Sequence, residues 1–510
     1  MNGNKGNGSS GSGSHRAAES SNKFARIKSS NFKFERVKSK TTIQKEKSKP
    51  KTSPKSPAAK DKSKKTHKDK KDKKKHKHKH KHKDKHRQKK PRLSSSNGKP
   101  QASSPNSVDL AKQAQRKLKQ YKQWKQYIPF LYEYIAVHVL PWPSLTVCWV
   151  PSITGENVKV DGSSDENVTT HRILVGCNAE ASGNEQYISL CSVNLPNENE
   201  NESKNSTKYA ANMKNIGRYT QRSTIQRMKI MPQRPELVAS ITASGDVIII
   251  NTGDANRENG NEFKLELTLK GHTNEGYGLD WSSKNKGRLL SSCEDTVICL
   301  WDIESNGGKS GGIVAEINPV RRFRGHKKSV GDVRWHHREE HVFGSVSDDC
   351  MLALWDTRVS GDNVPSQQTK GHDSDINCLD FSKFDDNYLV TGGGNSTVYL
   401  WDRRRLKSKT HEFKHHSGGI LQLHWCPFQR NVFCTSSEDT KVCIWDIDKI
   451  GIEQTPEEAL DGAPELLFLH SGHTEAVFDV SWNPDQDWTL ASTAEDNVVQ
   501  IWSVAMPIRA

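Results

Sequence analysis

Histidine, hydroxyl and carboxylate side chains recur in this sequence at one fixed spacing, and this combination can perform nucleophilic catalysis. A catalytic triad is built once in an enzyme, whereas this spacing occurs five times. Five copies predict a structural role, so we expect no catalytic residue among them and no enzyme activity. The sets are His272, Ser291, Asp295, Trp301; His326, Ser345, Asp349, Trp355; His372, Thr391, Asn395, Trp401; His416, Thr435, Asp439, Trp445; and His473, Ser492, Asp496, Trp502.

Hydrogen bonding gives each set a structural reason. A buried Trp indole and a buried His both need partners, because an unpaired buried polar group costs about 1–3 kcal/mol. A hydroxyl on a neighbouring strand and an Asp in a tight turn can supply them. We therefore expect a Trp–Ser/Thr–His–Asp chain, called here a tetrad, in each repeat. The third repeat has Asn395 in place of the acid, and we expect its link to His372 to be weaker.

The wider pattern predicts the fold. Gly precedes His in four sets, Asp follows Trp in four, and the period is 40–60 residues. These features are typical of WD40 propeller blades, which are four-stranded sheets that stack around an axis. Five strand-like runs upstream leave room for two more blades: 145–150, 173–176, 187–193, 224–230 and 246–251. Seven blades close without an exposed edge. We predict an all-β, seven-bladed WD40 β-propeller over residues 141–510.

Residues 108–140 are expected to dock on the propeller. Ser107 can cap a helix, and Pro129 is expected to kink it or to begin a second short helix. Only eight residues follow Trp502, which is short for a fourth strand, so a segment before the first blade is expected to complete the last one. Apolar residues recur at helical spacing: Leu110, Ala114, Leu118, Tyr121, Trp124 and Ile128.

The first 107 residues have a different composition. They contain 34 Lys and Arg against 7 Asp and Glu, whereas the remainder contains 43 against 53. With few large apolar residues, this tail is predicted to be disordered. The run Lys64–Arg92 is compatible with a nuclear import signal, with sequence-independent contact to nucleic acid, with metal binding by its histidines, or with a solvated tail. It is also compatible with folding back on the acidic body, where it would compete with a basic partner.

Cysteine usage and hydropathy bound the compartment. The ten cysteines form no Cys-x-x-Cys pair, so we expect free thiols in a reducing environment. No apolar run reaches the length of a membrane span. We expect an intracellular protein, nuclear and alternatively cytoplasmic, with no membrane partner, no metal and no cofactor.

An acidic insertion at 447–471 separates the last two repeats. It contains Glu453, Glu457, Glu458, Asp461 and Glu465, followed by the apolar run Leu466–Leu469. Proline and glycine residues indicate a loop rather than a helix. Ring closure is expected to bring this loop beside the N-terminal helix, where both would suit a partner helix with one apolar and one basic side. The alternative is a solvated connector.

From Tyr121 onward the sequence resembles the retinoblastoma-binding, MSI-type histone-binding WD40 proteins, which include the small subunit of chromatin assembly factor. The resemblance covers about 390 of the 510 residues. The segments that carry it are Tyr121-Lys-x-Trp124, Pro129-Phe-Leu-Tyr132, Trp142-Pro-Ser-Leu-Thr146, His171-Arg172, Met231-Pro-Gln233, Asn274-Glu-Gly-Tyr-Gly-Leu279, Leu354-Trp-Asp-Thr-Arg358, Ile450-Gly-x-Glu-Gln454, Pro464-Glu-Leu-Leu-Phe468 and Glu495-Asp-Asn497.

This resemblance implies an adaptor that grips the first helix of histone H4 between the N-terminal helix and the acidic loop. It would present H3–H4 to chromatin assembly, acetylation, deacetylation, methylation or remodelling complexes. Glu458 and Asp461 would meet basic residues of the histone, while Leu460 replaces an acid of the family pattern. The implied apolar contacts are Phe130, Leu131, Ile135, Leu466, Phe468 and Leu469.

The family's second site is an acidic channel mouth that takes basic N-terminal segments of histone H3 and of transcriptional cofactors. This sequence departs from the pattern at Thr224, Gly331 and Gly419, where acids are expected, and at Leu421, which replaces an aromatic residue. The retained acids are alternatively only solvated surface. The matching residues are Glu275, Tyr277, Asp375, Asn377 and Glu495.

Two other functions are open at this point. Trp355-Asp-Thr-Arg358 and Trp401-Asp-Arg-Arg404 fit the Trp-Asp-x-Arg pattern of substrate receptors of cullin-4 ubiquitin ligases, although such arginines often pair with nearby acids. A general WD40 scaffold in an RNA or ribosome assembly complex is the other alternative. Gly392-Gly-Gly394 lies where a blade turn is expected and not after a Rossmann strand.

Overall fold

The computed structural model describes residues 107–152, 168–179, 185–196, 213–256, 262–305, 315–361, 363–460 and 462–509. The chain divides into two compact units, 1–31 with 110–510 and 32–109. Almost all described residues belong to the first unit. The tail predicted for residues 1–107 lies outside the described residues, apart from Ser107.

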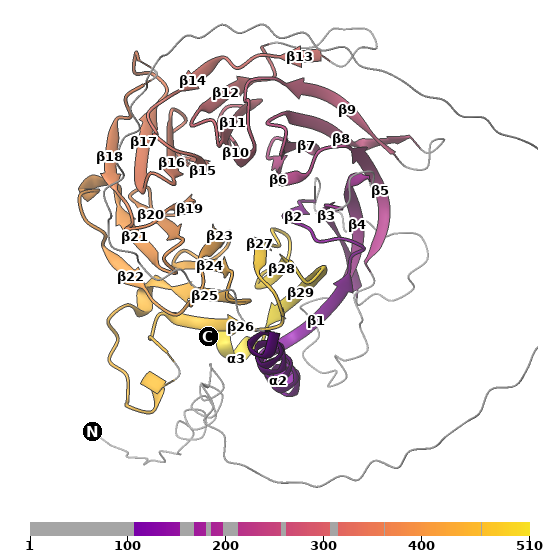
Figure 1. The fold of residues 1–510 in the computed structure, drawn as a ribbon, viewed down its shortest axis with the longest axis vertical. Helices are drawn as coiled ribbons and strands as arrows, with labels where there is room; N and C mark the ends of the chain where they lie inside the picture. The colour runs from indigo at the N-terminus through magenta and orange to yellow at the C-terminus, as the bar shows by residue number, and fades with distance from the viewer. Residues whose placement is uncertain are drawn as a thin grey trace, which may run out of the picture. The chain divides into compact units, whose positions relative to one another are not determined.

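Four sheets of the described region are antiparallel and come from consecutive stretches of chain (Figure 1). They are blade 3, with β10 (Gly276–Trp281), β11 (Arg288–Cys293), β12 (Ile298–Asp302) and β14 (Arg321–Phe323); blade 4, with β15 (Val330–Trp335), β16 (Val342–Ser347), β17 (Met351–Asp356) and β18 (Gln367–Lys370); blade 5, with β19 (Ile376–Phe381), β20 (Tyr388–Gly393), β21 (Val398–Asp402) and β22 (His411–Phe413); and blade 6, with β23 (Ile420–Trp425), β24 (Val432–Ser437), β25 (Val442–Asp446) and β26 (Leu466–His470).

Two further blades are joined at their outer strands into one nine-stranded sheet. The link is a parallel contact between Arg218 and Glu262, and β13 (Ala315–Ile317) adds to it beside β9. The upstream runs predicted from sequence overlap β2, β3, β4, β6 and β8, whereas β5, β7 and β9 were not anticipated. Blade 1 has β2 (Val147–Val150), β3 (Val168–Cys177), β4 (Gln186–Pro196) and β5 (Lys214–Gln221); blade 2 has β6 (Ile225–Met231), β7 (Arg234–Thr242), β8 (Val247–Asn256) and β9 (Glu262–Leu269).

Blade 7 closes the ring with strands from both ends of this unit. Its strands are β27 (Val477–Trp482), β28 (Thr489–Ala494), β29 (Val498–Val504) and β1 (Tyr132–Val139), and β1 runs antiparallel to β29. The prediction that a segment before the first blade completes the last one is confirmed. Because β2 packs on both β27 and β6, the described sheets form a closed seven-bladed propeller (Figure 1).

The N-terminal helix is α2 (Ser107–Leu131), one element that ends two residues beyond Pro129. Tyr121, Trp124 and Ile128 pack on blade 7, as their spacing predicts. Leu118 does not, since 53 % of it is exposed, and Lys117 instead takes that turn of the packed face and contacts Glu475. The side chains of Leu110 and Ala114 lie outside the described set. No helix in the described ranges is long and apolar enough to cross a membrane.

Candidate functional site

The first tetrad has the predicted contacts. Trp301 Nε1 donates to Ser291 Oγ at 2.8 Å, and Ser291 Oγ lies 2.7 Å from His272 Nε2. The other ring nitrogen of His272 lies 3.1 Å from Asp295 Oδ2. These three bonds tie β12, β11, the strand turn and the loop before β10 to one another. The side chains therefore stabilise the blade and leave neither imidazole nitrogen free.

Three other tetrads repeat this geometry. The His–hydroxyl distances are 2.7 Å for His326, 2.8 Å for His372 and 2.8 Å for His416. Although burial opposes ionisation, hydrogen bonds from His326 and from the Lys327 N–H hold the pKa of Asp349 at about 2. In the third repeat, Asn395 Oδ1 lies 3.1 Å from His372 Nδ1, and burial lowers the pKa of His372 to about 4.

The fifth tetrad is looser. Its His473 Nδ1 to Asp496 Oδ1 distance is 3.5 Å, and Trp502 Nε1 lies 3.2 Å from Ser492 Oγ. Beside it, His470 stacks on the Trp502 indole with ring centroids 4.4 Å apart. This blade is also the one that receives the N-terminal strand, so its tetrad shares its space with ring closure.

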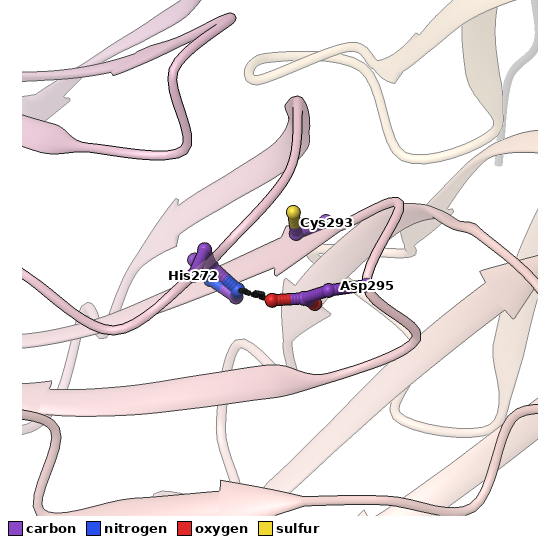
Figure 2. Close-up of side chains that lie close together, drawn as sticks. All are labelled: His272, Cys293 and Asp295. Atoms are coloured by element: carbon purple, nitrogen blue, oxygen red, sulfur yellow. Dashed lines mark hydrogen bonds and ion pairs between the residues drawn. The ribbon is translucent and has the colours of Figure 1, made fainter. Parts of the chain in front are cut away.

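A cysteine beside the first tetrad raises the question of a metal centre. His272, Cys293 and Asp295 offer ligand atoms within 4.8 Å of one another. Figure 2 shows the His272 and Asp295 side chains pointing at each other, with the Cys293 sulfur set apart. Cys293 Sγ contacts the Asn274 carbonyl oxygen at 2.9 Å, and burial raises its thiol pKa to about 12. A protonated thiol is a poor ligand, so the geometry fits a structural tetrad better than a metal site.

The other tetrads support this conclusion. The position equivalent to Cys293, eight residues before the tetrad Trp, holds Ser347, Gly393, Ser437 and Ala494 in the other repeats. Gly and Ala have no ligand atom, and the His contact to Asn395 or Asp496 is nevertheless kept. The His–acid pair therefore persists without a third ligand.

A buried hydrogen-bond chain fixes α2 to the ring. Trp124 Nε1 donates to Tyr132 Oη at 3.0 Å, and Tyr132 Oη lies 2.8 Å from His470 Nδ1. Burial raises the pKa of Tyr132 and lowers the pKa of His470 well below its ordinary value, so the phenol donates to a neutral imidazole. Sequence reasoning missed His470, although it precedes the tetrad His473 by three residues.

The predicted H4-contacting residues divide by exposure. Phe130, at the end of α2, is 51 % exposed, whereas Leu131 is buried and Ile135 is partly buried. Phe468 is only 2 % exposed, because it stacks on Trp502 and meets the edge of Tyr132. Leu466 is buried and Leu469 partly buried in the core between blades 5 and 6. The buried members therefore support this surface from beneath, and Phe130 is its outward aromatic residue.

The loop between β25 and β26 carries exposed acids. Its turns are η4 (Ile447–Lys449) and η5 (Glu458–Leu460), and Glu453, Glu457 and Glu458 are exposed. The Thr455 N–H donates to Glu458 Oε2 at 2.9 Å and lowers the pKa of this carboxyl. Glu465 is instead buried and bonds His411 at 2.9 Å. Asp461 lies outside the described residues.

Apolar side chains stand among these acids and at the chain end. Leu460 is 78 % exposed and Met506, the first residue of α3 (Met506–Arg509), is 62 % exposed. The Ala505 N–H donates to the Leu131 carbonyl oxygen at 3.0 Å, which places Met506 next to the end of α2. In Figure 1, α2, α3, β26 and the loop lie on the same side of the ring.

The predicted channel-mouth residues come from the turns at one end of the innermost strands. Tyr277 Oη donates to Glu275 Oε2 at 3.2 Å, and Gln226 also bonds Glu275. Asn377 Nδ2 donates to the Ile420 carbonyl oxygen at 2.8 Å. Glu495 is partnered through its backbone, where its N–H donates to Ala476.

Further acids share this end of the channel. An acid precedes the tetrad acid in four repeats, at Glu294, Asp348, Glu438 and Glu495. In the third repeat the equivalent residue is Gly394, and the Asp375 carboxylate lies 2.5 Å from where its Cβ would be. Burial and then the charges of Asp375 and Glu294 raise the pKa of Asp348. Sequence reasoning missed this set, although its constant position beside the tetrad acid is visible.

Comparison with protein families decides the identity. The family described as histone-binding protein RBBP4 or a subunit of the CAF1 complex matches residues 119–197. The WD domain, G-beta repeat family matches 263–302, 317–356, 363–402, 407–446 and 464–503. The chain belongs to the RBBP4, MSI-type histone-binding WD40 proteins.

The matched ranges agree with the geometry of a histone-binding WD40 protein. The RBBP4-type match covers the second half of α2, with Phe130 and Trp124, and continues through β1 into blade 1. The five WD40 matches each enclose one tetrad. The chain is thus a histone-binding adaptor whose family-specific segment is the one that joins α2 to blade 7.

The Trp-Asp-x-Arg pattern has a local explanation in this WD40 protein. Arg358 Nη2 lies 2.7 Å from Asp356 Oδ2, and Arg404 Nη2 lies 2.8 Å from Asp402 Oδ2. Each Arg therefore pairs with the Asp two residues before it. This pairing accounts for the pattern without a ligase partner.

Proposed function

We propose that this protein binds the first helix of histone H4 on the surface bounded by the end of α2, α3 and the loop 447–465. The observation that carries the proposal is Phe130, a large apolar side chain held half-exposed. Its helix cannot shift easily, because Trp124 is anchored to Tyr132 and His470 inside blade 7. A fixed aromatic residue contributes area at little entropic cost, as interface anchors do.

The charge of this surface indicates the chemistry of the partner. Glu453, Glu457 and Glu458 are exposed on the loop side, and their carboxylates favour Arg and Lys. Phe130 and Met506 provide apolar contact on the other side. A helix with one basic and one apolar face meets both requirements. Phe468 and Leu131, which lie beneath, keep the surface rigid rather than touching the partner.

In the cell, we propose a nuclear adaptor without catalytic activity, which presents H3–H4 to chromatin assembly or modifying complexes. The tetrad histidines have both ring nitrogens engaged in the blades, as His272 shows, so they support structure rather than proton transfer. Any chemistry on the histone then belongs to a partner enzyme.

Binding of an H4 first-helix peptide to the full chain tests the proposal. Phe130→Ala is expected to weaken binding by at least about tenfold, since a central aromatic anchor is worth about 2 kcal/mol or more. Val364→Ala is the matched control, because Val364 is 71 % exposed on blade 4. Glu457→Lys with Glu458→Lys is expected to weaken binding in a salt-dependent manner. Its control is Glu185→Lys with Glu316→Lys, two exposed acids elsewhere.

A wild-type chain that fails to bind the peptide contradicts the proposal. Equal affinities of the Phe130→Ala and Val364→Ala variants would place the peptide elsewhere. Thermal unfolding of each variant separates loss of contact from loss of fold.

A second candidate site is the channel mouth. The grouping of Glu294, Asp348 and Asp375, with like charges close enough to raise a carboxyl pKa, favours a cationic ligand there. We propose that this end binds a basic N-terminal peptide of the histone H3 kind. Asp348→Asn with Asp375→Asn is expected to weaken such a peptide and to leave H4-helix binding unchanged.

A further inference from the structure

The outward face of α2 is basic along its described length. Helix α2 contains six cations, Lys112, Arg116, Lys117, Lys119, Lys122 and Lys125, and a single acid, Asp109. Lys117 faces the ring and pairs with Glu475 at 2.6 Å. Arg116, Lys119, Lys122 and Lys125 are all exposed. Within the described part of the chain, no carboxylate forms an ion pair with Arg116 or Lys122.

This arrangement differs from an ordinary solvated helix face. Exposed helices usually mix both signs, so that Glu and Lys three or four residues apart stabilise each other. Here the four exposed cations follow one another at three-residue intervals, which places like charges side by side along the helix. Their repulsion has no compensating acid on the described part of α2. A bound anion would remove this repulsion.

The spacing fits a phosphate backbone. Three residues of α-helix rise about 4.5 Å, so the four cations span about 14 Å. One strand of a duplex presents a phosphate about every 3.4 Å along its axis, so about four phosphates fall within that span. On this face of the described helix no aromatic ring is available to stack on bases, since Trp124 is buried and Lys125 covers Tyr121 at 4.7 Å. Stacking is what single-strand binders need, so the duplex backbone is the better match.

The charge of the whole chain is consistent with this ligand. The sequence leading into α2 is strongly basic, with 34 Lys and Arg against 7 Asp and Glu up to residue 107. The remainder is acidic, with 43 against 53, and repels nucleic acid elsewhere. The exposed cations of α2 thus extend the basic region onto a fixed helix.

We propose that the face of α2 made by Arg116, Lys119, Lys122 and Lys125 binds the phosphate backbone of duplex DNA without sequence preference. The face is held in place by the anchoring of Trp124 and Tyr132 and is separate from Phe130, the outward residue of the histone surface. The protein would then contact DNA and histone through different parts of one helix.

Binding of the full chain to a 20-base-pair duplex, followed by fluorescence anisotropy at several salt concentrations, tests this inference. The variant Arg116→Glu, Lys119→Glu, Lys122→Glu is expected to bind about tenfold more weakly and to lose about 0.9 of the log–log salt slope for each phosphate contact removed. The matched control is Lys284→Glu, Lys328→Glu, Lys407→Glu, which changes net charge equally at three scattered exposed positions.

Lysine acetylation of the full chain with and without the duplex locates the contact independently of the tail. Lys119 and Lys122 are expected to be protected at low salt and reactive at high salt, while Lys284 and Lys407 stay reactive throughout. Protection confined to residues 1–107 overturns the inference, because the tail alone would then bind DNA. Equal loss of affinity in the two triple variants also overturns it, since only net charge would matter.

Discussion

Tyr132 Oη lies 2.8 Å from Nδ1 of His470, although the two residues are 338 positions apart in the chain. Tyr132 begins β1, the strand that completes blade 7, and His470 ends β26, the outer strand of blade 6. The same phenol accepts from Trp124 of α2. One hydroxyl thus joins the helix, the closing strand and the neighbouring blade.

Replacing this phenol tests its contribution. Tyr132→Phe leaves the Trp124 indole N–H and His470 Nδ1 buried without a partner, and each such group costs about 1–3 kcal/mol. We expect the free energy of unfolding in urea to fall by about 2 kcal/mol or more. Tyr219→Phe is the control, because Tyr219 is partly buried at the edge of the core of blades 1 and 2. Equal losses in the two variants would show that the hydroxyl network contributes nothing specific.

Stability is expected to decrease as the pH falls below about 6.5. Burial lowers the pKa of His372 to about 4, and that of His470 well below its ordinary value. Between the folded and the unfolded pKa the unfolded chain binds the extra proton, so acid favours unfolding. Each such His costs up to about 1.4 kcal/mol per pH unit. Urea unfolding at pH 7.5 and pH 5.5 measures the effect, and an unchanged midpoint would contradict it.

The third tetrad offers an exchange within one fold. Asn395→Asp gives His372 Nδ1 a carboxylate partner, and a charge-assisted bond is stronger than a neutral one. We expect the variant to be more stable by about 1 kcal/mol near pH 7. Asp349→Asn makes the reverse change beside His326 in blade 4 and should destabilise by a similar amount. Denaturation midpoints of both variants check the pair, and a stabilising Asp349→Asn would refute the assigned role of the acid.

The sequence predicts the tetrads and the ring because their signals are local or repeated. His272, Ser291 and Trp301 recur as a set, and the short end after Trp502 implies that a strand is missing from the last blade. Contacts that depend on register between distant strands carry no such signal. The pairing of Tyr132 with His470 requires β1 and β26 to lie at one particular offset.

Orientation within a strand or helix was equally hard to predict. The apolar run at Leu466–Leu469 indicated a binding surface, but most of it faces inward, and Phe468 fills the space between Tyr132 and Trp502. In α2, packing the row that begins at Lys117 rather than at Leu118 turns one predicted core residue to solvent. Because such rotations of one residue change which side chains are exposed, the position of a surface is better predicted than its members.

Met506 extends this point to the partner's side of the interface. It lies near the chain end, outside every repeat, and its backbone is fixed because Arg509 bonds Glu133 at 2.8 Å and Ser503 at 2.7 Å. With 62 % exposure beside the end of α2, it can add apolar contact next to Phe130. Met506→Asp is expected to weaken H4-helix binding by about tenfold, since a carboxylate would replace buried apolar area. Val139→Asp, at a 68 % exposed position on β1, is the matched control. Calorimetric titration of the peptide into each variant gives the affinities. If the wild type binds and Met506→Asp binds equally well, the partner helix does not reach α3.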